Sequence, residues 1–344
     1  MPDREVFILS AVRTPFGPMN DGSSLDLSEQ VITESARRAG VDVGRLEDVI
    51  WGAALHVGVQ VSRSTGSGQQ AVHFAAQAIL AGDADIILAG GSEPGAGSVM
   101  KSLGSEYDQG EELANLEKLA EKWSIQRDEM DDYVYESLLR YSEAIRAGFF
   151  EGQILPVNLT DGKRLALDQE SGQVTTREQL ATLKPFTGDT GRITAGNKAR
   201  VTPGAAALVL ASAQAVGKLN LLPRARIERR VLTAGETGND MNALVSASQL
   251  ALKNAGLDLA EMDVIVVDED SALNVLAWRR ALQVDPRKVN PNGGALAHGH
   301  AQGAMGVILM TGLLHELERR AGRFGLQVMS AGHEMAIATI IERV

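Results

Sequence analysis

Two parts of this 344-residue chain follow the same plan in the same order. Residues 39–50 (AGVDVGRLEDVI) match residues 255–265 (AGLDLAEMDVI). Each half then has a glycine-rich turn, a long helix, an apolar strand and a turn of small residues, over 66–93 and 299–334. Self-similarity of this kind is typical of an internal duplication. We therefore expect two similar halves with the same order of strands and helices.

Short apolar segments alternate with helical ones in each half. Continuous apolar runs bounded by turns are typical of strands that are buried on both faces, as in a parallel sheet covered by helices. The predicted fold class is therefore α/β, with two doubly wound halves. The expected strands are 5–11, 48–54, 57–61, 86–89 and 204–211, and the expected helices are 27–39, 66–80 and 129–147.

Residues 94–200 are more polar and more charged than the rest of the chain. They contain the amphipathic helix at 129–147, and 161–173 is expected to form a hairpin or a loop. We interpret this insert as a lid-like subdomain at the open end of the first half's sheet. The predicted division is 1–93 with 201–219 as the first half, 94–200 as the insert, and 220–344 as the second half.

The composition excludes several functions. The chain has no cysteine, so disulfides, thiolate metal ligands and a cysteine nucleophile are all excluded. Its net charge is −11 with both signs mixed along the chain, which argues against a nucleic-acid-binding surface. No apolar run approaches the roughly 18–20 residues of a membrane helix, and the charged start lacks the apolar segment of a signal peptide. We expect a cytoplasmic protein.

Three motifs resemble those of the thiolase family. They are VRTPFG at 12–17, AGN with GAAALV at 195–209, and NGGA with GH and GA at 292–304. The resemblance implies the thiolase fold, in which duplicated βαβαβαββ halves form a five-layered α-β-α-β-α core, here with a shortened insert. It also implies a homodimer or a dimer of dimers, with 57–61 as an edge strand that pairs across a two-fold axis. Coenzyme A or an acyl-CoA would be the ligand, with no covalently bound cofactor.

The catalytic positions of the family are altered in this sequence. Thiolases use one cysteine at a helix N-terminus as nucleophile and a second as base, and the matching residues here are Thr65 and Ser330. The family's histidine, which polarises the thioester oxygen, is retained as His300. Gly332 is also retained, so that its N–H and that of Thr65 could form an oxyanion hole. The family's asparagine, which orients a water, is replaced by Asp268.

The ligand-contacting positions also differ from the family pattern. The aromatic residue of the Asn-Glu-Ala-Phe loop is Ser271, and the Ser-Gly pair that contacts pantetheine falls at Ala199 and Arg200. The His-Met pair near the acyl pocket falls at Glu111 and Glu112. No metal is expected, although a zinc ion held by the three histidines of this region is an alternative. Those histidines are His298, His300 and His333.

Two functions of different classes follow from these replacements. The first is a thiolase-like protein of the acetyl-CoA acetyltransferase type that has lost Claisen and thiolysis activity. It would serve as a binding or partner subunit, with a second protein as a further candidate partner. The second is a coenzyme A-thioester enzyme with changed chemistry, either hydrolysis or aldol-type cleavage, that uses His300 and Asp268. Ordinary acetyltransferase activity is a third alternative.

Overall fold

The structure is a computed structural model of the chain, and it describes residues 5–17, 19, 24–52, 59–61, 63–94, 109–159, 162–169, 176–235, 240–332 and 334–344. The strands are β1 Val6–Arg13, β2 Asp48–Gly52, β3 Val59–Val61, β4 Ile86–Glu93, β5 Val157–Asn158, β6 Arg164–Leu165, β7 Gly204–Ser212, β8 Ala225–Ala234, β9 Val264–Val267, β10 Phe324–Ser330 and β11 Met335–Arg343. The α-helices are α1 Ser24–Arg38, α2 Ser67–Ala81, α4 Gln109–Lys122, α5 Arg127–Arg146, α6 Arg177–Thr182, α7 Ala213–Leu219, α8 Asp240–Ala255, α9 Ala272–Leu282, α10 Ala295–His298 and α11 Gln302–Arg320.

The strands confirm the duplication that the sequence predicts. The large sheet has the order β3-β2-β4-β7-β1-β8-β11-β10-β9. We compare the two halves by following the strands outward from the centre of the sheet. In both β1-β7-β4-β2 and β8-β11-β10-β9, the first two pairs of neighbouring strands are antiparallel and the third pair is parallel. The two halves are joined where Phe7 pairs with Arg226 and Ile8 pairs with Ala225. Among the described residues, β3 at the edge of the first half has no counterpart in the second.

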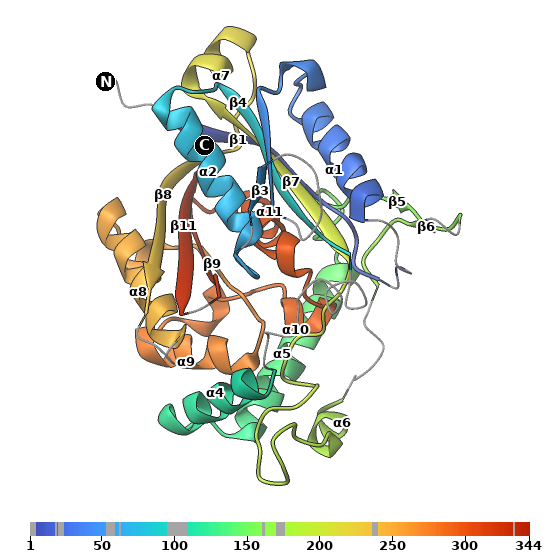
Figure 1. Ribbon diagram of the computed structural model, residues 1–344, viewed down its shortest axis with the longest axis vertical. Coiled ribbons are helices and arrows are strands. Elements are labelled where there is room, and N and C mark those ends of the chain that lie inside the picture. Colours follow the sequence, from blue (N-terminus) through green and yellow to red (C-terminus); the bar gives the residue numbers. More distant parts are fainter. Residues whose placement is uncertain are drawn as a thin grey trace.

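Helices cover both faces of each half in five layers (Figure 1). Helix α1 packs on the outer face of the first half's strands, and α8 and α9 lie beyond the outer face of the second half's. Helices α2 and α11 lie between the two halves and pack against each other. Three hydrophobic clusters correspond to these interfaces, and the central one unites residues of α2, α11 and both sets of strands. The predicted five-layered thiolase fold is therefore present.

Glycines allow the central helices to approach the sheet and each other at backbone distance. A Cβ on Gly91 would lie 2.3 Å from the carbonyl oxygen of Gly303, and one on Gly68 would lie 2.8 Å from the same oxygen. A Cβ on Gly306 would lie 2.4 Å from the backbone nitrogen of Gln69. These contacts bring the N-terminal ends of α2 and α11 together, because Gly68 and Gly303 are both in the first turns of their helices.

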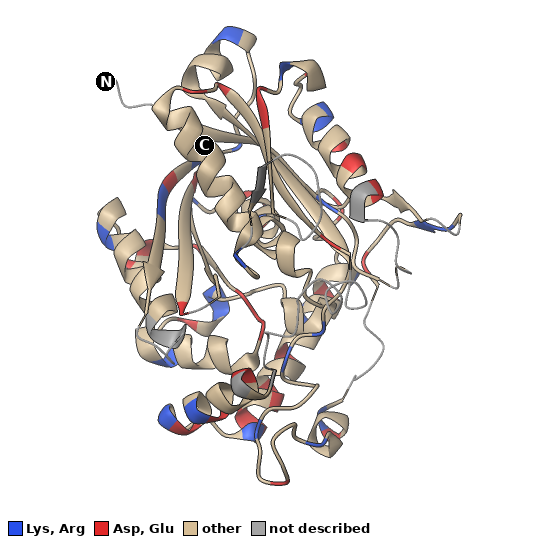
Figure 2. Cartoon of the chain, in the orientation of Figure 1, with Lys and Arg blue, Asp and Glu red and all other residues tan. Residues whose placement is uncertain are grey.

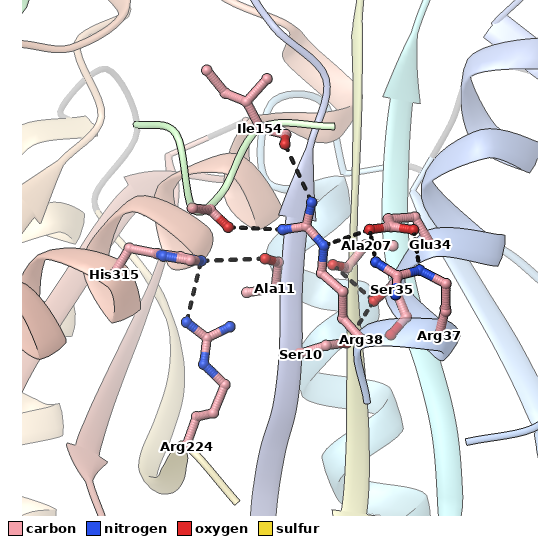
Figure 3. Close-up of polar contacts among 11 residues, drawn as sticks. Ser10, Ala11, Glu34, Ser35, Arg37, Arg38, Ile154, Ala207, Arg224 and His315 are labelled. Carbon is pink, nitrogen blue, oxygen red and sulfur yellow. Dashed lines mark hydrogen bonds and ion pairs between the residues drawn. The ribbon is translucent and has the colours of Figure 1, made fainter. Parts of the chain in front are cut away.

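Buried polar contacts fix the elements on either side of β1 (Figure 3). Ser35 on α1 lies 2.8 Å from the hydroxyl of Ser10 on β1, and it donates to the carbonyl of Ala207 on β7. Arg38, on the same helix, donates to the carbonyl of Ile154 at 3.2 Å. A helix that reaches its sheet through side-chain hydroxyls satisfies polar groups that burial would otherwise leave without partners.

The insert contacts both halves, which differs from the predicted position at the first half's sheet. The β5–β6 hairpin and Asp168 lie against the first half, where Asp168 forms a buried ion pair with Arg13 at 2.6 Å. Helices α4 and α5 instead pack against α9, and α5 also packs against α10. The sequence shows an apolar stripe on α5, but a stripe does not identify the surface that it will cover.

Element boundaries agree with most of the expected ones. Helix α1 ends before Gly40, whose φ of +68° is the left-handed conformation predicted for that position. The described strands β2 and β3 are shorter than the expected 48–54 and 57–61, and residues 53–58 lie outside the described residues. A hairpin or loop was expected at 161–173; the hairpin of β5 and β6 begins earlier, at Val157, and only β6 lies within that range, while 161 and 170–173 lie outside the described residues.

Charged residues of both signs are mixed over the described chain (Figure 2). They occur on helices of the outer layers and of the insert, with acidic and basic positions side by side. None of the described helices combines the length and the apolar composition that crossing a membrane requires.

The glycine contacts generate a stability prediction. We expect Gly91→Ala to lower the free energy of unfolding by about 1–3 kcal/mol, because the added methyl group overlaps the backbone of α11. Urea denaturation measures this change. Gly217→Ala on α7 is the matched control, since its Cβ would meet nothing within 4 Å and alanine favours a helix by about 1 kcal/mol. Equal stabilities of the two variants would contradict the role assigned to the close approach.

Candidate active site

A buried histidine–carboxylate pair lies at the centre of the candidate site. His300 Nε2 is 3.0 Å and 3.2 Å from the two carboxylate oxygens of Asp268. The residues are 1% and 3% exposed. Burial opposes charge on the imidazole, but the Asp268 carboxylate outweighs it and raises the pKa of His300 above its ordinary value. The structure therefore brings together the two residues that the sequence predicted to act together.

The neighbouring backbone explains how these two side chains meet. Asp268 follows β9, and its N–H donates to the carbonyl of Val328 on β10. The backbone N–H of His300 donates to the carbonyl of Arg200 at 2.8 Å, and the backbone carbonyl of His300 accepts from the N–H of Thr202 at 3.0 Å. Gly299 before it has a φ of +97°, and a Cβ there would lie 2.2 Å from the Thr202 side chain. Only glycine fits this turn, which delivers His300 beside the end of β9.

Thr65 and Ser330, the residues at the two cysteine positions, contact each other. The Thr65 hydroxyl donates to the backbone carbonyl of Ser330 at 3.1 Å. The N–H of Gly332 points at the Ser330 hydroxyl at 3.4 Å, and a Cβ on Gly66 would lie 2.9 Å from Ala331. The turn before α2 therefore packs on the turn after β10, and the threonine hydroxyl is used to join them.

Ser67, rather than Thr65, stabilises the turn at the start of α2. Its N-cap is Gly66, without a side-chain cap. The Ser67 hydroxyl accepts from the N–H of Arg63 and donates to the carbonyl of Ser64 at 2.6 Å. Thr65 is thus no cap, and Ser67 stabilises the turn that precedes the helix.

A second ionic cluster lies next to the histidine pair. Lys198 forms ion pairs with Glu112 at 2.9 Å and with Asp270 at 3.1 Å. Burial opposes the charge of Lys198, but the two carboxylates raise its pKa. Burial also disfavours the Asp270 carboxylate, yet Lys198 and His300 lower its pKa. Sequence reasoning missed this cluster, whose Lys198 and Asp270 stand in AGNKA at 195–199 and in the acidic run DED at 268–270, far apart along the chain.

The remaining residue of that acidic loop, Glu269, is structural. Its carboxylate accepts from Tyr133 at 2.7 Å, Ser137 at 2.9 Å and Asn290 at 2.8 Å, and from the N–H of Leu296. Burial raises its pKa. The donors come from α5, α10 and the loop before α10, so Glu269 holds the insert against the second half.

The predicted ligand-contacting residues have different environments. The Ala199 N–H donates to the carbonyl of Asp270 at 2.8 Å, and Arg200 is exposed. Ser271 is fully buried, and its hydroxyl caps α9 by accepting from the N–H of Leu273. Glu112 pairs with Lys198, whereas nothing is described for the side chain of Glu111. Their contacts with a ligand stay predictions.

The histidines of this region have separate roles in the structure. His298 stacks on Phe16 with ring centroids 4.0 Å apart, and burial together with Arg13 lowers its pKa to about 3. His333 lies outside the described residues. Within the described ranges, no three His, Cys, Asp or Glu side chains are arranged to hold a metal ion.

Comparison with known families identifies the scaffold. The model of the thiolase N-terminal domain matches residues 6–102 and 96–214, and that of the thiolase C-terminal domain matches residues 221–343. The chain belongs to the thiolase family. The two matches meet near the start of β8, which is where the structure joins its halves.

Relatives align with this thiolase-family chain over almost all of its length. A steroid 3-ketoacyl-CoA thiolase of Mycobacterium tuberculosis is 34% identical over 98% of this chain and 94% of its own. A beta-ketothiolase of Cupriavidus necator is 33% identical over 99% of this chain and 100% of its own. The crystal structure of human mitochondrial 3-ketoacyl-CoA thiolase superposes with a TM-score of 0.91 at 31% identity, covering 99% of each chain.

The geometry limits the chemistry open to this family member. The Nε2 atom of His300 is engaged by the Asp268 carboxylate, so it is not directed at a hydroxyl or a substrate. His300 Nδ1 is buried, and no described residue forms a hydrogen bond with it. The site can supply a positive charge and a proton, but threonine and serine hydroxyls cannot replace the two thiolates without a strong base beside them.

The histidine pair generates a protonation prediction. Asp268→Asn should lower the pKa of His300, since burial is then opposed by the more weakly acting Asp270 carboxylate alone. An NMR pH titration of a ring-labelled histidine sample should give a higher His300 pKa in the wild type than in the variant.

The raised pKa of His300 also determines in which direction the pair's contribution to stability changes with pH. The pair's contribution is complete below the unfolded-state pKa and is lost as the pH rises through the higher folded-state value. Asp285→Asn, in an exposed ion pair with Arg287, is the control and should leave His300 unchanged. An Asp268→Asn variant with an unshifted His300 pKa would show that the carboxylate does not hold the charge.

Proposed function

We propose that this chain is a thiolase-family protein that binds an acyl-CoA thioester but has lost Claisen and thiolysis activity, and that it serves as a binding or partner subunit. The hydrogen bond from the Thr65 hydroxyl to the Ser330 carbonyl carries this proposal. It joins the two positions at which the family's chemistry needs free thiolates, and it uses the threonine hydroxyl as a structural donor.

The contacts of His300 support the same proposal. A nucleophilic hydroxyl needs a neighbouring base, but the described hydrogen bonds of the His300 ring go to Asp268, and that of the Thr65 hydroxyl goes to the Ser330 carbonyl. Asp268 also places a carboxylate where negative charge would develop on a thioester or enolate oxygen, and this raises the barrier for thiolase chemistry.

An acyl-CoA is the ligand favoured by the family scaffold. A crystal structure of human mitochondrial 3-ketoacyl-CoA thiolase in complex with CoA superposes with a TM-score of 0.91 over 99% of this chain. The turns at residues 64–66 and 330–332 pack against each other, and in this proposal the N–H groups of Thr65 and Gly332 bind a thioester oxygen, with that of Gly332 leaving the Ser330 hydroxyl to which it now points.

A second candidate is an enzyme that hydrolyses a thioester or cleaves an aldol-type carbon–carbon bond. The His300–Asp268 pair favours it, because such a pair can hold and deliver a proton without any thiol. In this candidate His300 acts as an acid on the carbonyl or leaving group, and Asp268 maintains its charge.

The thiolase scaffold further suggests a cytoplasmic homodimer, or a dimer of dimers, and a second protein as a further possible partner. The edge strand β3 supports the dimer: it pairs with β2 on one side, and in the described structure no strand pairs with its other side. An edge strand of this kind is suited to pairing with a second copy across a two-fold axis.

Binding and turnover should be separable in one sample. We expect calorimetry to detect acetyl-CoA binding at micromolar concentrations, while acetoacetyl-CoA thiolysis stays at background, because the pocket persists without nucleophile or base. The Cupriavidus necator beta-ketothiolase is the positive control for the assay. Thiolysis by the purified chain would refute the proposal, as would an absence of binding at millimolar acetyl-CoA.

The same assay distinguishes the second candidate. Slow release of coenzyme A without acceptor, abolished in His300→Ala, would favour hydrolysis. Release that persists unchanged in His300→Ala would remove His300 from any such reaction.

The edge strand generates a prediction about assembly. Sedimentation equilibrium should give a mass of about two or four chains of 36.6 kDa each. A single 36.6 kDa species across micromolar concentrations would contradict pairing through β3.

A further inference from the structure

The sequence motif VRTPFG, at residues 12–17, has no part in the proposed function, yet it packs behind the candidate site. Its contact is with residues 298–301, which we call the histidine loop. The ring of Phe16 stacks on that of His298, with centroids 4.0 Å apart and planes inclined by 16°. Because His298 stands two residues before His300, this contact acts on the segment that delivers the imidazole of the site.

The same motif also supports the residue that follows His300. The backbone N–H of Thr14 donates to the carbonyl of Ala205 at 2.9 Å, and the N–H of Ala205 donates to the Thr14 hydroxyl at 3.1 Å. These bonds fix the start of β7, where a Cβ on Gly204 would lie 3.0 Å from the Cβ of Ala301. The histidine loop is therefore backed on both sides of His300.

One residue of the insert holds the motif in this position. Asp168 accepts two hydrogen bonds from the guanidinium group of Arg13, at 2.6 Å and 2.8 Å, and a third from the N–H of Phe16 at 2.8 Å. The guanidinium group also lies against the rings of Phe16 and Phe150, 5.1 Å and 5.2 Å from their centroids. Asp168 thus fixes both the cation and the backbone of the residue that stacks on His298.

The pair of Arg13 and Asp168 is charged and buried. The two residues are 2% and 6% exposed. Burial disfavours the charge of Asp168, but Arg13 outweighs it and lowers the pKa of that carboxyl. A buried charge that loses its partner is costly, so each ion depends on the other. The pair therefore restricts the turn at residues 13–16 to the arrangement in which both charges are satisfied.

We propose that Arg13, Phe16 and Asp168, here called the positioning unit, determine where the histidine loop places the imidazole of the candidate site. The ion pair holds the Phe16 ring against the loop, and the loop in turn keeps His300 Nε2 at 3.0 Å from Asp268. These residues act through the loop and not by contact with a ligand. The proposal goes beyond the proposed function, since it concerns the protein without a ligand.

Phe16→Leu tests the stacking contact without removing a charge. Leucine keeps an apolar side chain of similar size but cannot stack on an imidazole. We expect His300 to move away from Asp268, so that burial is less well compensated and the pKa of His300 falls. Asp270 and Lys198, which also act on this imidazole, are unchanged in the variant. An NMR pH titration of ring-labelled protein measures the shift, with the signal assigned from the spectrum of His300→Gln.

Phe7→Leu is the matched control. Phe7 lies on β1 and packs with the outer hydrophobic cluster of the first half, whereas Phe16 belongs to the central cluster. Urea denaturation establishes that both variants are folded. Only Phe16→Leu should lower the pKa of His300. An equal shift in both variants would mean that any loss of packing disturbs the site, and it would overturn the proposal.

A double variant tests whether the ion pair acts through Phe16. Asp168→Asn keeps the shape of the side chain but leaves Arg13 without a negative partner. Asp168→Asn combined with Phe16→Leu should shift the pKa of His300 no further than the larger of the two single shifts, because residues of one unit are not additive. Additive shifts would mean that Asp168 acts on His300 through its electrostatic field alone, which overturns the unit.

The Phe16→Leu measurement is decisive on its own. If Asp168→Asn does not fold, a lowered pKa of His300 in Phe16→Leu, with Phe7→Leu unshifted, still supports the positioning unit. An unshifted His300 in folded Phe16→Leu overturns it. Neither outcome depends on acyl-CoA binding, so the proposed function stands or falls separately.

Discussion

The contact between α2 and α11 is the constraint on which the rest of the structure depends. Gly68 of α2 and Gly91 of β4 both meet the carbonyl of Gly303 on α11 at a distance that excludes any Cβ. Gly68 and Gly303 lie in the first turns of α2 and α11, and Gly91 lies on the strand beside them. The N-terminal ends of the two helices therefore lie next to each other between the halves. The turns that carry Thr65 and His300 each precede one of these helices. Small residues in the core thus decide where the candidate site lies.

Ionic and polar pairs fill the region around His300. Asp268, Asp270 and Glu112 pair with His300 and Lys198 in a largely buried setting. Burying a charge is costly unless a partner compensates it, and removing one partner leaves the other charge uncompensated. These residues therefore depend on one another. They also give the site an electrostatic character opposed to thiolate formation, since nearby carboxylates disfavour a further negative charge.

Several features could be predicted from residues close together in the sequence. The matched segments 39–50 and 255–265 predicted the duplication, and β2 and β9 lie at equivalent positions of the two halves. The absence of cysteine excluded a thiol nucleophile, and the resemblance predicted that Thr65 and Ser330 occupy the family's two cysteine positions. The pairing of His300 with Asp268 was also predicted. The cluster around Lys198 was missed, because its members are separated by about seventy residues or more and no local pattern relates them.

The sequence by itself determined the fold class and the duplication, because periodicity and glycine positions act through local backbone geometry and burial. It also determined which functional groups are absent, since chemistry needs particular atoms. Only the tertiary structure decided which partners the remaining groups take. Helix α5 covers α9 and α10 rather than the first half's sheet alone, Thr65 donates to Ser330, and Lys198 lies between Glu112 and Asp270. These choices depend on distances between segments that are remote along the chain, and packing of the whole core sets those distances.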